Sequence, residues 1–310
     1  MASETNGNEA GDGQPGEAEA KSGQRPAPAL KTPMFQASHS DRYLRQSLIK
    51  KIEQTTSRRL ICFVCGEDAL IKRDDTLGFV DLLTNVNEGE DLSLLLHTPG
   101  GDPDAAEKLI TLVHKKVDGA TLHVIVPDYA KSAGTLMALG ANKIIMSDSS
   151  ELGPIDPQII LEDGRGNRIN HSVLCFLDAY ETHEAALRAN PDDPVARMML
   201  AKLDPATVKM FEAVRARARK FAETQLQQWM FRGGSGNVTK IANDLMDTKR
   251  FPSHGQMVGY EDAIDLGLVA EYLPPTDPLW ADYWQLYCLQ RLAVKDAERL
   301  FESNWVSLTF

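Results

Sequence analysis

The sequence lacks the features by which nucleic-acid-binding, membrane-spanning and secreted proteins are usually recognised. Its 33 lysine and arginine residues are outnumbered by 44 aspartate and glutamate residues, which gives a formal net charge of -11 at pH 7. Affinity for phosphate backbones comes from clustered cations, so this charge excludes a generic nucleic-acid partner. No apolar run approaches the roughly 18 residues that span a bilayer. No cationic side chain precedes Lys21, as it would in a secretory signal. We therefore expect a soluble, cytoplasmic protein without a membrane span.

Cysteine is also scarce, with four residues in 310. Such low usage is typical of buried free thiols in a reducing compartment and argues against a disulfide framework. Cys62 and Cys65 have the spacing of a zinc or redox pair, but they lie in a strand-like apolar run, where residues three apart point to opposite faces. No second ligand pair accompanies them, and no Gly-x-x-x-x-Gly-Lys loop is present. The sequence predicts no metal and no cofactor.

Composition divides the chain into three parts. Residues 1–37 contain almost no large apolar side chains, so they cannot offset the entropy of ordering and are predicted to be a disordered tail. Residues 38–275 are predicted to form the functional domain. Residues 276–310 are rich in aromatic side chains and are predicted to form a helical C-terminal extension.

Within the domain the pattern is that of an α/β fold. Short, continuous apolar runs alternate with helical segments, and strands that are apolar on both faces require helices on both sides of a largely parallel sheet. These runs occupy residues 60–65, 92–97, 122–126 and 143–146. The second half is more helical, with helices predicted over 172–187 and 205–231. Asp204 and Pro205 form a favourable start for the latter.

Three segments could carry chemistry. His97-Thr-Pro-Gly-Gly101 follows a strand, and adjacent glycines can form either a simple turn or a loop whose uncovered N–H groups bind an oxyanion. Ser132, in Lys-Ser-Ala-Gly-Thr, begins a helix, where a hydroxyl is either a nucleophile or only the helix cap. The third segment is Ser150-Glu-Leu-Gly-Pro-Ile-Asp-Pro-Gln158, followed much later by Ala-Ile-Asp-Leu-Gly-Leu-Val269.

In this order the segments resemble the ClpP/crotonase superfamily, and within it the serine dehydrogenase proteinase family, relatives of the signal peptide peptidase SppA. The resemblance covers roughly residues 57–272. It implies a β-β-α superhelical fold with a helical C-terminal region. It also implies that Ser132 is the nucleophile and that an oxyanion hole is formed by the N–H group of Ala133 together with that of Gly100 or Gly101.

The general base stays open. In the ClpP-like peptidases that this sequence resembles, a histidine follows the serine by about 25 residues. Asp156 stands near that place here. An ionised carboxylate is a poor acceptor for a serine proton. SppA-like members resemble a Ser-Lys design instead. Lys202, which apolar residues flank, is our first choice for that lysine. His254 is the alternative, either as base or orienter or as a structural loop histidine. His97 and Asp156 are expected to line the site.

Together these features predict a serine peptidase that acts on a peptide or protein substrate. Two other hypotheses remain: a crotonase-like acyl-CoA enzyme, in which a similar oxyanion hole polarises a thioester, and a non-catalytic oligomeric scaffold of the same fold. Self-association into a homo-oligomer is expected as well. Members of the superfamily typically oligomerise, and the aromatic C-terminal segment offers apolar surface that a monomer would have difficulty covering.

Overall fold

The structure, a computed structural model, describes residues 32–162, 166–234 and 236–310. The chain divides into two compact units, Met1–His39 and Ser40–Phe310. The disordered tail predicted for residues 1–37 lies outside the described residues up to residue 31. In the described part of the first unit, α1 (Pro33–Ser38) is a short helix capped by the Thr32 hydroxyl, which accepts a hydrogen bond from Phe35 N at 3.4 Å. The last residues of the predicted tail are therefore helical.

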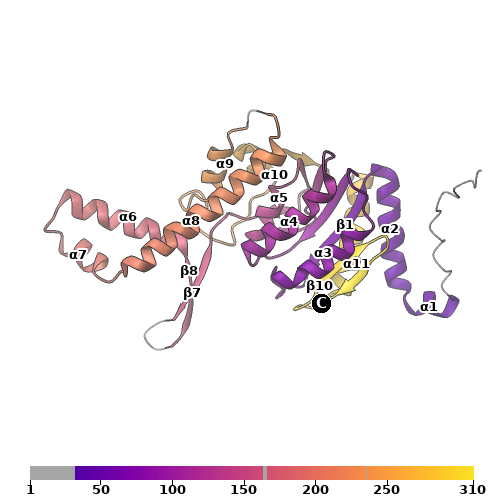
Figure 1. Cartoon of the computed structure of the whole chain (residues 1–310), viewed down its shortest axis with the longest axis horizontal. Coiled ribbons are helices and arrows are strands. Elements are labelled where there is room, and N and C mark those ends of the chain that lie inside the picture. The colour runs from indigo at the N-terminus through magenta and orange to yellow at the C-terminus, as the bar shows by residue number, and fades with distance from the viewer. Residues whose placement is uncertain (1–31, 163–165, 235) are drawn as a thin grey trace, which may run out of the picture. The chain divides into compact units, whose positions relative to one another are not determined.

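A seven-stranded sheet forms the centre of the second unit (Figure 1). Its strand order is β11-β10-β1-β2-β3-β5-β9, and its pairs are parallel except for β1 with β10 and β10 with β11. The strand bounds are β1 Arg59–Cys65, β2 Leu92–His97, β3 Leu122–Ile125, β5 Lys143–Met146, β9 Ala270–Tyr272, β10 Arg299–Ser303 and β11 Ser307–Thr309. The four strands predicted from apolar runs are β1, β2, β3 and β5. The α/β class with a largely parallel sheet is therefore confirmed.

Additional short strand pairing follows β2, β3 and β5, and it is succeeded directly by a helix after β2 and β3. After β3 come β4 (Tyr129–Ala130) and α5 (Ala133–Ala138). After β2, Thr98 forms a bridge with Ala130 before α4 (Pro103–Val117) begins, and after β5, β6 (Glu151–Leu152) pairs with β4. This succession is the β-β-α unit that the resemblance implies.

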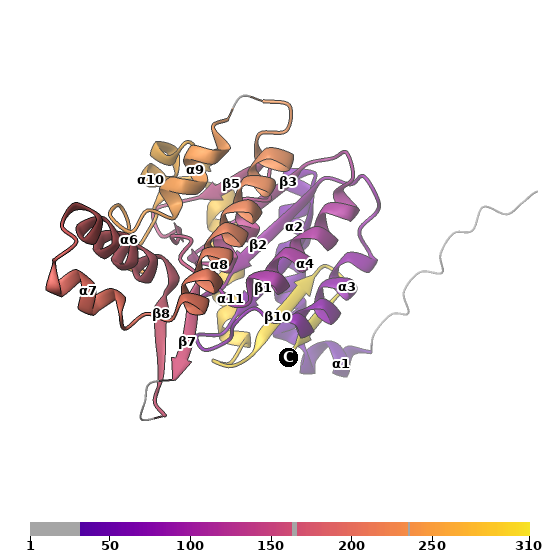
Figure 2. The same cartoon turned by 60° about the vertical axis from the view of Figure 1, so that its left-hand side comes forward.

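Helices cover both faces of the sheet (Figure 2). One apolar cluster joins the sheet to α3 (Thr76–Thr84), α4 and α5, and a second joins it to α2 (Ser40–Thr56) and α11 (Pro278–Ala293). Strand β1 shows why its run is continuously apolar, since alternate side chains enter the two clusters. Ile61, Phe63 and Cys65 belong to the first cluster, and Leu60, Cys62 and Val64 belong to the second.

The two thiols of the Cys-x-x-Cys pair therefore point to opposite faces, as the strand spacing predicted. Burial raises the pKa of the Cys62 thiol, and it raises that of Cys65 to about 12, so both are protonated near neutral pH. Cys175 and Cys288 are exposed, contrary to the expectation of buried thiols, because both lie on the outward sides of helices. Among the described residues, no cluster of His, Cys, Asp or Glu could hold a metal ion.

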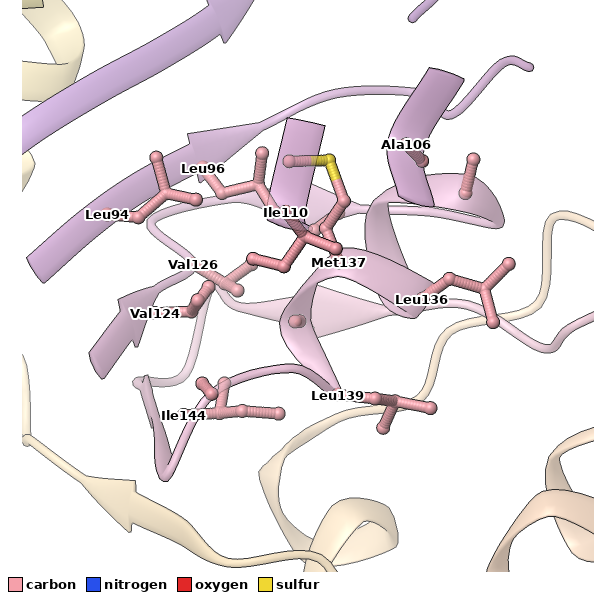
Figure 3. Packing of buried hydrophobic residues seen from close by; sticks show 14 of the residues in the cluster. Leu94, Leu96, Ala106, Ile110, Val124, Val126, Leu136, Met137, Leu139 and Ile144 are labelled. Atoms are coloured by element: carbon pink, nitrogen blue, oxygen red, sulfur yellow. The ribbon is translucent and has the colours of Figure 1, made fainter. Parts of the chain in front are cut away.

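The short helix α5 packs against the sheet and α4. Its Met137 is fully buried, and Figure 3 shows this side chain in the same apolar cluster as Ile110 of α4 and the strand residues Val124 and Val126. All six residues of α5 are buried. Because every residue of α5 is buried, the helix fixes the backbone of Ser132, which directly precedes it.

The second half adds a hairpin and a helical region. The strands β7 (Gln158–Glu162) and β8 (Arg168–Ser172) pair as an antiparallel hairpin, and residues 163–165 between them lie outside the described residues. The helices are α6 Val173–Ala189, α7 Pro194–Leu200, α8 Pro205–Gln225, α9 Val238–Leu245 and α10 Tyr260–Leu266, with a π-helical turn at Leu226–Met230 after α8. The predicted cap of α8 is confirmed, because Asp204 Oδ2 accepts a hydrogen bond from Thr207 N at 2.8 Å.

The C-terminal residues differ from the expectation of a helical extension from 276 to 310. The helix α11 is present, but the chain then forms β10 and β11 within the main sheet, so these residues belong to the same compact unit. Strand β10 was missed because Arg299 and Glu302 resemble surface residues in the sequence, whereas ion pairs allow both to be buried. None of the helices in the described ranges is long and apolar enough to cross a membrane.

Candidate active site

A cavity of about 1080 Å³ brings together several of the residues singled out in the sequence. Its walls include Gly101, Ser132, Ala133, Asp156 and His254. These residues come from the glycine loop, the start of α5, the third motif and the loop before α10. The remaining predicted site residues do not line it: these are His97, Gly100 and Lys202.

Ser132 is held in an unusual backbone conformation. It directly precedes α5 with φ 51° and ψ -113°, a region that side-chain-bearing residues rarely adopt. Its hydroxyl makes no capping hydrogen bond to the helix, which removes the interpretation of this serine as a simple helix cap. Non-glycine residues in such regions cost roughly 1–3 kcal/mol and persist where the surrounding structure imposes them, often at functional sites.

The strain at Ser132 leads to a stability prediction. Replacing Ser132 with glycine should raise the free energy of unfolding by about 1 kcal/mol, because glycine adopts a positive φ without steric cost and no cap hydrogen bond is lost. Urea unfolding of the two proteins measures the difference. A glycine variant less stable than the parent would show that the conformation at position 132 is not strained.

The glycine loop lies directly beside Ser132. Both Gly100 and Gly101 have positive φ, 108° and 146°. A Cβ atom on Gly100 would lie 2.9 Å from the Cβ of Ser132, so only glycine allows this approach. The N–H of Gly100 donates to the Thr98 hydroxyl at 3.1 Å. Within the described part of the chain, the N–H groups of Gly101 and Ala133 have no protein acceptor, and both residues line the cavity with Ser132.

His254 and Asp156 form a pair in the same cavity. The distance from His254 Nδ1 to Asp156 Oδ2 is 3.5 Å. The carboxylate is itself fixed, because Ser172 Oγ donates to its Oδ1 at 2.7 Å and Gln158 Nε2 donates to its Oδ2 at 2.5 Å. The amide nitrogen Nε2 of Gln158 also lies 3.4 Å from His254 Nδ1. In the tautomer whose Nδ1–H faces Asp156, Nε2 of His254 is available as a proton acceptor. Asp156 is largely buried and His254 is partly exposed.

Lys202 lies away from this group. It is exposed in the turn between α7 and α8, and its backbone N–H donates to Met199 O at 3.3 Å. The apolar neighbours that suggested a desolvated amine do not enclose it, because their spacing serves the two helices instead. The described lysine that does line the cavity is Lys72, which the sequence gave no reason to single out.

Lys131, which precedes the serine, has a largely buried side chain with several hydrogen-bond acceptors. Its ammonium group donates to Glu151 Oε2 at 2.7 Å and to the carbonyl oxygens of Leu152 and Gln256 at 3.1 and 3.2 Å. Only 13% of the side chain is exposed. These acceptors favour the protonated ammonium form, which has no lone pair with which to take a proton. Lys131 therefore joins the loop after His254 to the start of α5 and is not suited to take a proton.

His97 is fully buried, with its ring against Tyr129 and Tyr287 rather than at the cavity. The Tyr287 hydroxyl lies 3.3 Å from Nδ1 of His97 and donates to Asp128 Oδ2 at 2.6 Å. Burial lowers the pKa of His97 to about 3, so the ring is neutral over the pH range in which peptidases work.

Because His97 is buried in its neutral form, stability should fall in acid. Histidine in an unfolded chain has a pKa near 6.5, so below that pH the unfolded state binds a proton that folded His97 excludes. The contribution of neutral His97 to the free energy of unfolding is complete above pH 6.5 and is lost as the pH falls toward 3. Between pH 6.5 and 5 the loss is about 2 kcal/mol. Urea unfolding at several pH values should show a shallower acid dependence in His97→Phe. An identical dependence would mean that the buried ring accepts the proton.

A comparison with a protein-family model matches residues 43–164 to the ClpP-like SDH-type serine proteinases. Two uncharacterised proteins of Methanocaldococcus jannaschii are similar in sequence. MJ1495 is 31% identical over an alignment of 153 residues, which covers 43% of this chain and 52% of that protein. MJ0137 is 48% identical over 68 residues, 22% of this chain and 23% of that protein. The matched part thus spans about half the length of the first relative and about a quarter of the second.

Two solved structures show distant similarity. A variant of the 1510-N membrane-bound stomatin-specific protease is 16% identical with a TM-score of 0.43, over 71% of this chain and 81% of that one. ClpP1 from Listeria monocytogenes is 13% identical with a TM-score of 0.38, over 76% and 99% of the two chains.

The family match contains the glycine loop, Ser132, Ala133 and Asp156, and it ends before Lys202 and His254. The similarity predicted from the ordered motifs is therefore confirmed for the segment that carries the serine and the glycines. What the comparison shows is a match of residues 43–164 of this chain to the model of the ClpP-like SDH-type serine proteinases.

Proposed function

We propose that this protein is a serine peptidase in which Ser132 is the nucleophile and His254 the general base. The observation that carries the proposal is the shared cavity. A serine in a strained position before α5, two backbone N–H groups without a protein acceptor, and a histidine paired with a carboxylate all line the same space. These are the parts that acyl transfer to a serine needs.

In the proposed reaction, Ser132 Oγ attacks the carbonyl carbon of the scissile peptide bond while its proton passes to Nε2 of His254. Asp156 faces Nδ1, where it orients the ring and stabilises the imidazolium. The N–H groups of Gly101 and Ala133 donate to the developing oxyanion. The histidine then gives its proton to the leaving amine, and an acyl-enzyme ester remains. Water, activated by the same histidine, hydrolyses the ester and restores the serine.

The resemblance favoured a dyad of Ser132 and Lys202. The present proposal has His254 in place of Lys202. Lys202 is exposed and is not among the residues that line the cavity, whereas His254 is. Asp156 stands where ClpP-like peptidases carry their histidine, and it acts here as the partner of a histidine from a later loop. Of the two glycines, Gly101 is assigned to the oxyanion, because the N–H of Gly100 already donates to Thr98.

The substrate class and assembly are also part of the proposal. Cavity walls from α8 and the hairpin carry apolar side chains such as Ile160, Met210 and Phe221, which suit a peptide segment better than a nucleotide-bearing thioester. Homo-oligomerisation stays a proposal, supported by exposed apolar residues on α7 and α11, among them Met198 and Leu292. A cytoplasmic location remains an expectation.

Labelling with a fluorophosphonate, which reacts with activated serines, tests the proposed function. The wild-type protein should form a covalent adduct at Ser132, identified by mass spectrometry of peptides, and His254→Ala should react far more slowly. An intact, folded protein that no such reagent labels would favour the non-catalytic scaffold instead.

A further inference from the structure

The conformation of the glycine loop depends on a neighbouring segment around Ile71. Ile71 N donates to Gly100 O at 2.8 Å, and Asp102 N donates to Ile71 O at 3.0 Å. These two hydrogen bonds bracket Gly101, the residue assigned to the oxyanion. The approach is close, because a Cβ atom on Gly101 would lie 2.4 Å from Ile71 O. The position of the Gly101 N–H group therefore follows the position of Ile71.

A buried ion pair fixes the segment that contains Ile71. Asp75 ends the 3-10 turn Arg73–Asp75, and its Oδ2 accepts a hydrogen bond from Lys72 N at 2.8 Å. Its Oδ1 lies 2.7 Å from Arg299 Nε. The side chains of Asp75 and Arg299 are only 1% and 7% exposed. One carboxylate thus connects the residue after Ile71 to the C-terminal strand β10.

Strand β10 is itself well anchored near Arg299. The backbone N–H of Arg299 donates to Phe310 O at 2.9 Å, and Phe310 N donates to Arg299 O at 3.1 Å. Just before the strand, the carbonyl oxygens of Asp296 and Glu298 accept hydrogen bonds from Asp68 and Gly66, both at 2.8 Å. The C-terminal segment therefore holds both the beginning and the end of the loop that positions Gly101.

Stability alone does not explain this ion pair. Burial raises the pKa of the Asp75 carboxyl in spite of the nearby guanidinium, so taking the charges out of water is costly. Apolar residues of similar volume often replace a buried ion pair without loss of stability. A pair that connects separate segments can serve another purpose, since the close contact of its charges holds those segments in fixed relative positions.

We propose that Asp75 and Arg299 are positioning residues for the oxyanion-binding loop. They act on the reaction through Lys72, Ile71 and Gly101. Asp75 lies outside the cavity, whereas Arg299 also forms part of its wall. The inference rests on the proposed function for its effect on turnover, but the link from Asp75 to the glycine loop can be tested without any activity.

The sharpest test replaces the pair by apolar residues. The double variant Asp75→Leu with Arg299→Met should fold, and its kcat should fall about 100-fold because the Gly101 N–H group is no longer held at the oxyanion position. KM should change less than about threefold, since ground-state binding does not use the oxyanion site.

The protein offers a matched control on the same strand. Arg45 Nε and Glu302 Oε2 form a second buried ion pair, at 2.9 Å, which involves no residue of the loop from Gly66 to Asp75. The double variant Arg45→Met with Glu302→Leu should keep kcat within about threefold of the wild type. Equal losses in the two double variants would mean that burial of charge in β10 matters only for folding, which would overturn the inference.

Hydrogen exchange supplies a readout that is independent of turnover. In the variant of Asp75 and Arg299, the amides of Ile71 and Asp102 should exchange at least tenfold faster than in the wild type, while amides of α4 keep their protection. Unchanged protection overturns the inference, whether or not the protein hydrolyses peptides. If the double variant does not fold, Arg299→Lys replaces it. The lysine keeps the charge but loses the guanidinium geometry, so faster exchange at Ile71 is again expected.

An inactive wild-type protein would refute the proposed peptidase and leave the exchange experiment to decide the role of the ion pair. An active wild type whose Asp75 and Arg299 variant retains full kcat would refute the positioning role and leave the peptidase intact. The two failures are therefore distinguishable.

Discussion

Ser132→Ala is expected to lower kcat for peptide hydrolysis by a factor of about 10⁴ or more, the loss typical of a removed serine nucleophile. The expected loss is this large because no other serine or threonine hydroxyl lines the cavity among the described residues. Folding should be unaffected, because the Ser132 hydroxyl makes no cap hydrogen bond and alanine has the same backbone preferences. Turnover of a fluorogenic peptide, together with the melting temperature, measures both effects.

The control for this prediction is Ser149→Ala. Ser149 is an exposed serine whose hydroxyl donates to Pro127 O at 2.9 Å, outside the cavity. This variant should keep full turnover. If Ser132→Ala retained the wild-type rate, the nucleophile assignment would be wrong, and the conformational strain at position 132 would need another explanation.

The sheet could be predicted from the sequence because its signal is local. The runs that became β1, β2, β3 and β5 are apolar at every position, and a strand covered on both faces has no other way to bury its side chains. Strand β10 has no such signal. Its residues Arg299 and Glu302 are buried only because Asp75 and Arg45, far away in the sequence, neutralise them. No periodicity reveals a pairing of that kind.

The same distinction applies to the site. The glycine loop and the serine each follow a strand, so their chemistry could be inferred from neighbouring residues alone. The choice of base could not, because it depends on which loop returns to the serine after more than a hundred residues. Apolar residues flank Lys202 in the sequence, but its side chain is exposed in the structure. His254 is far from Asp156 in the sequence, and the fold brings the two side chains together.

The base is tested by comparing two single variants. His254→Ala is expected to lower kcat by about 10³- to 10⁴-fold, since it removes the group that accepts the Ser132 proton and the one that protonates the leaving amine. Lys202→Ala should keep kcat within about threefold, because Lys202 is exposed outside the cavity. Lys72→Ala is the necessary control, as Lys72 is the lysine that lines the cavity in the described structure. It should also remain active.

The pH profile distinguishes the two kinds of base by a second, independent measurement. A histidine base is protonated and inactive in acid, so kcat/KM should be lost in acid and should not keep rising in alkali. A lysine base must be neutral to act, and even with a pKa lowered by two or three units from about 10.4 its activity would still rise toward alkaline pH. His97 cannot cause the expected rise, because burial keeps its pKa at about 3. A profile still rising at pH 9, together with an inactive Lys72→Ala or Lys202→Ala, would assign the base to that lysine. His254 would then be left as a structural partner of Asp156.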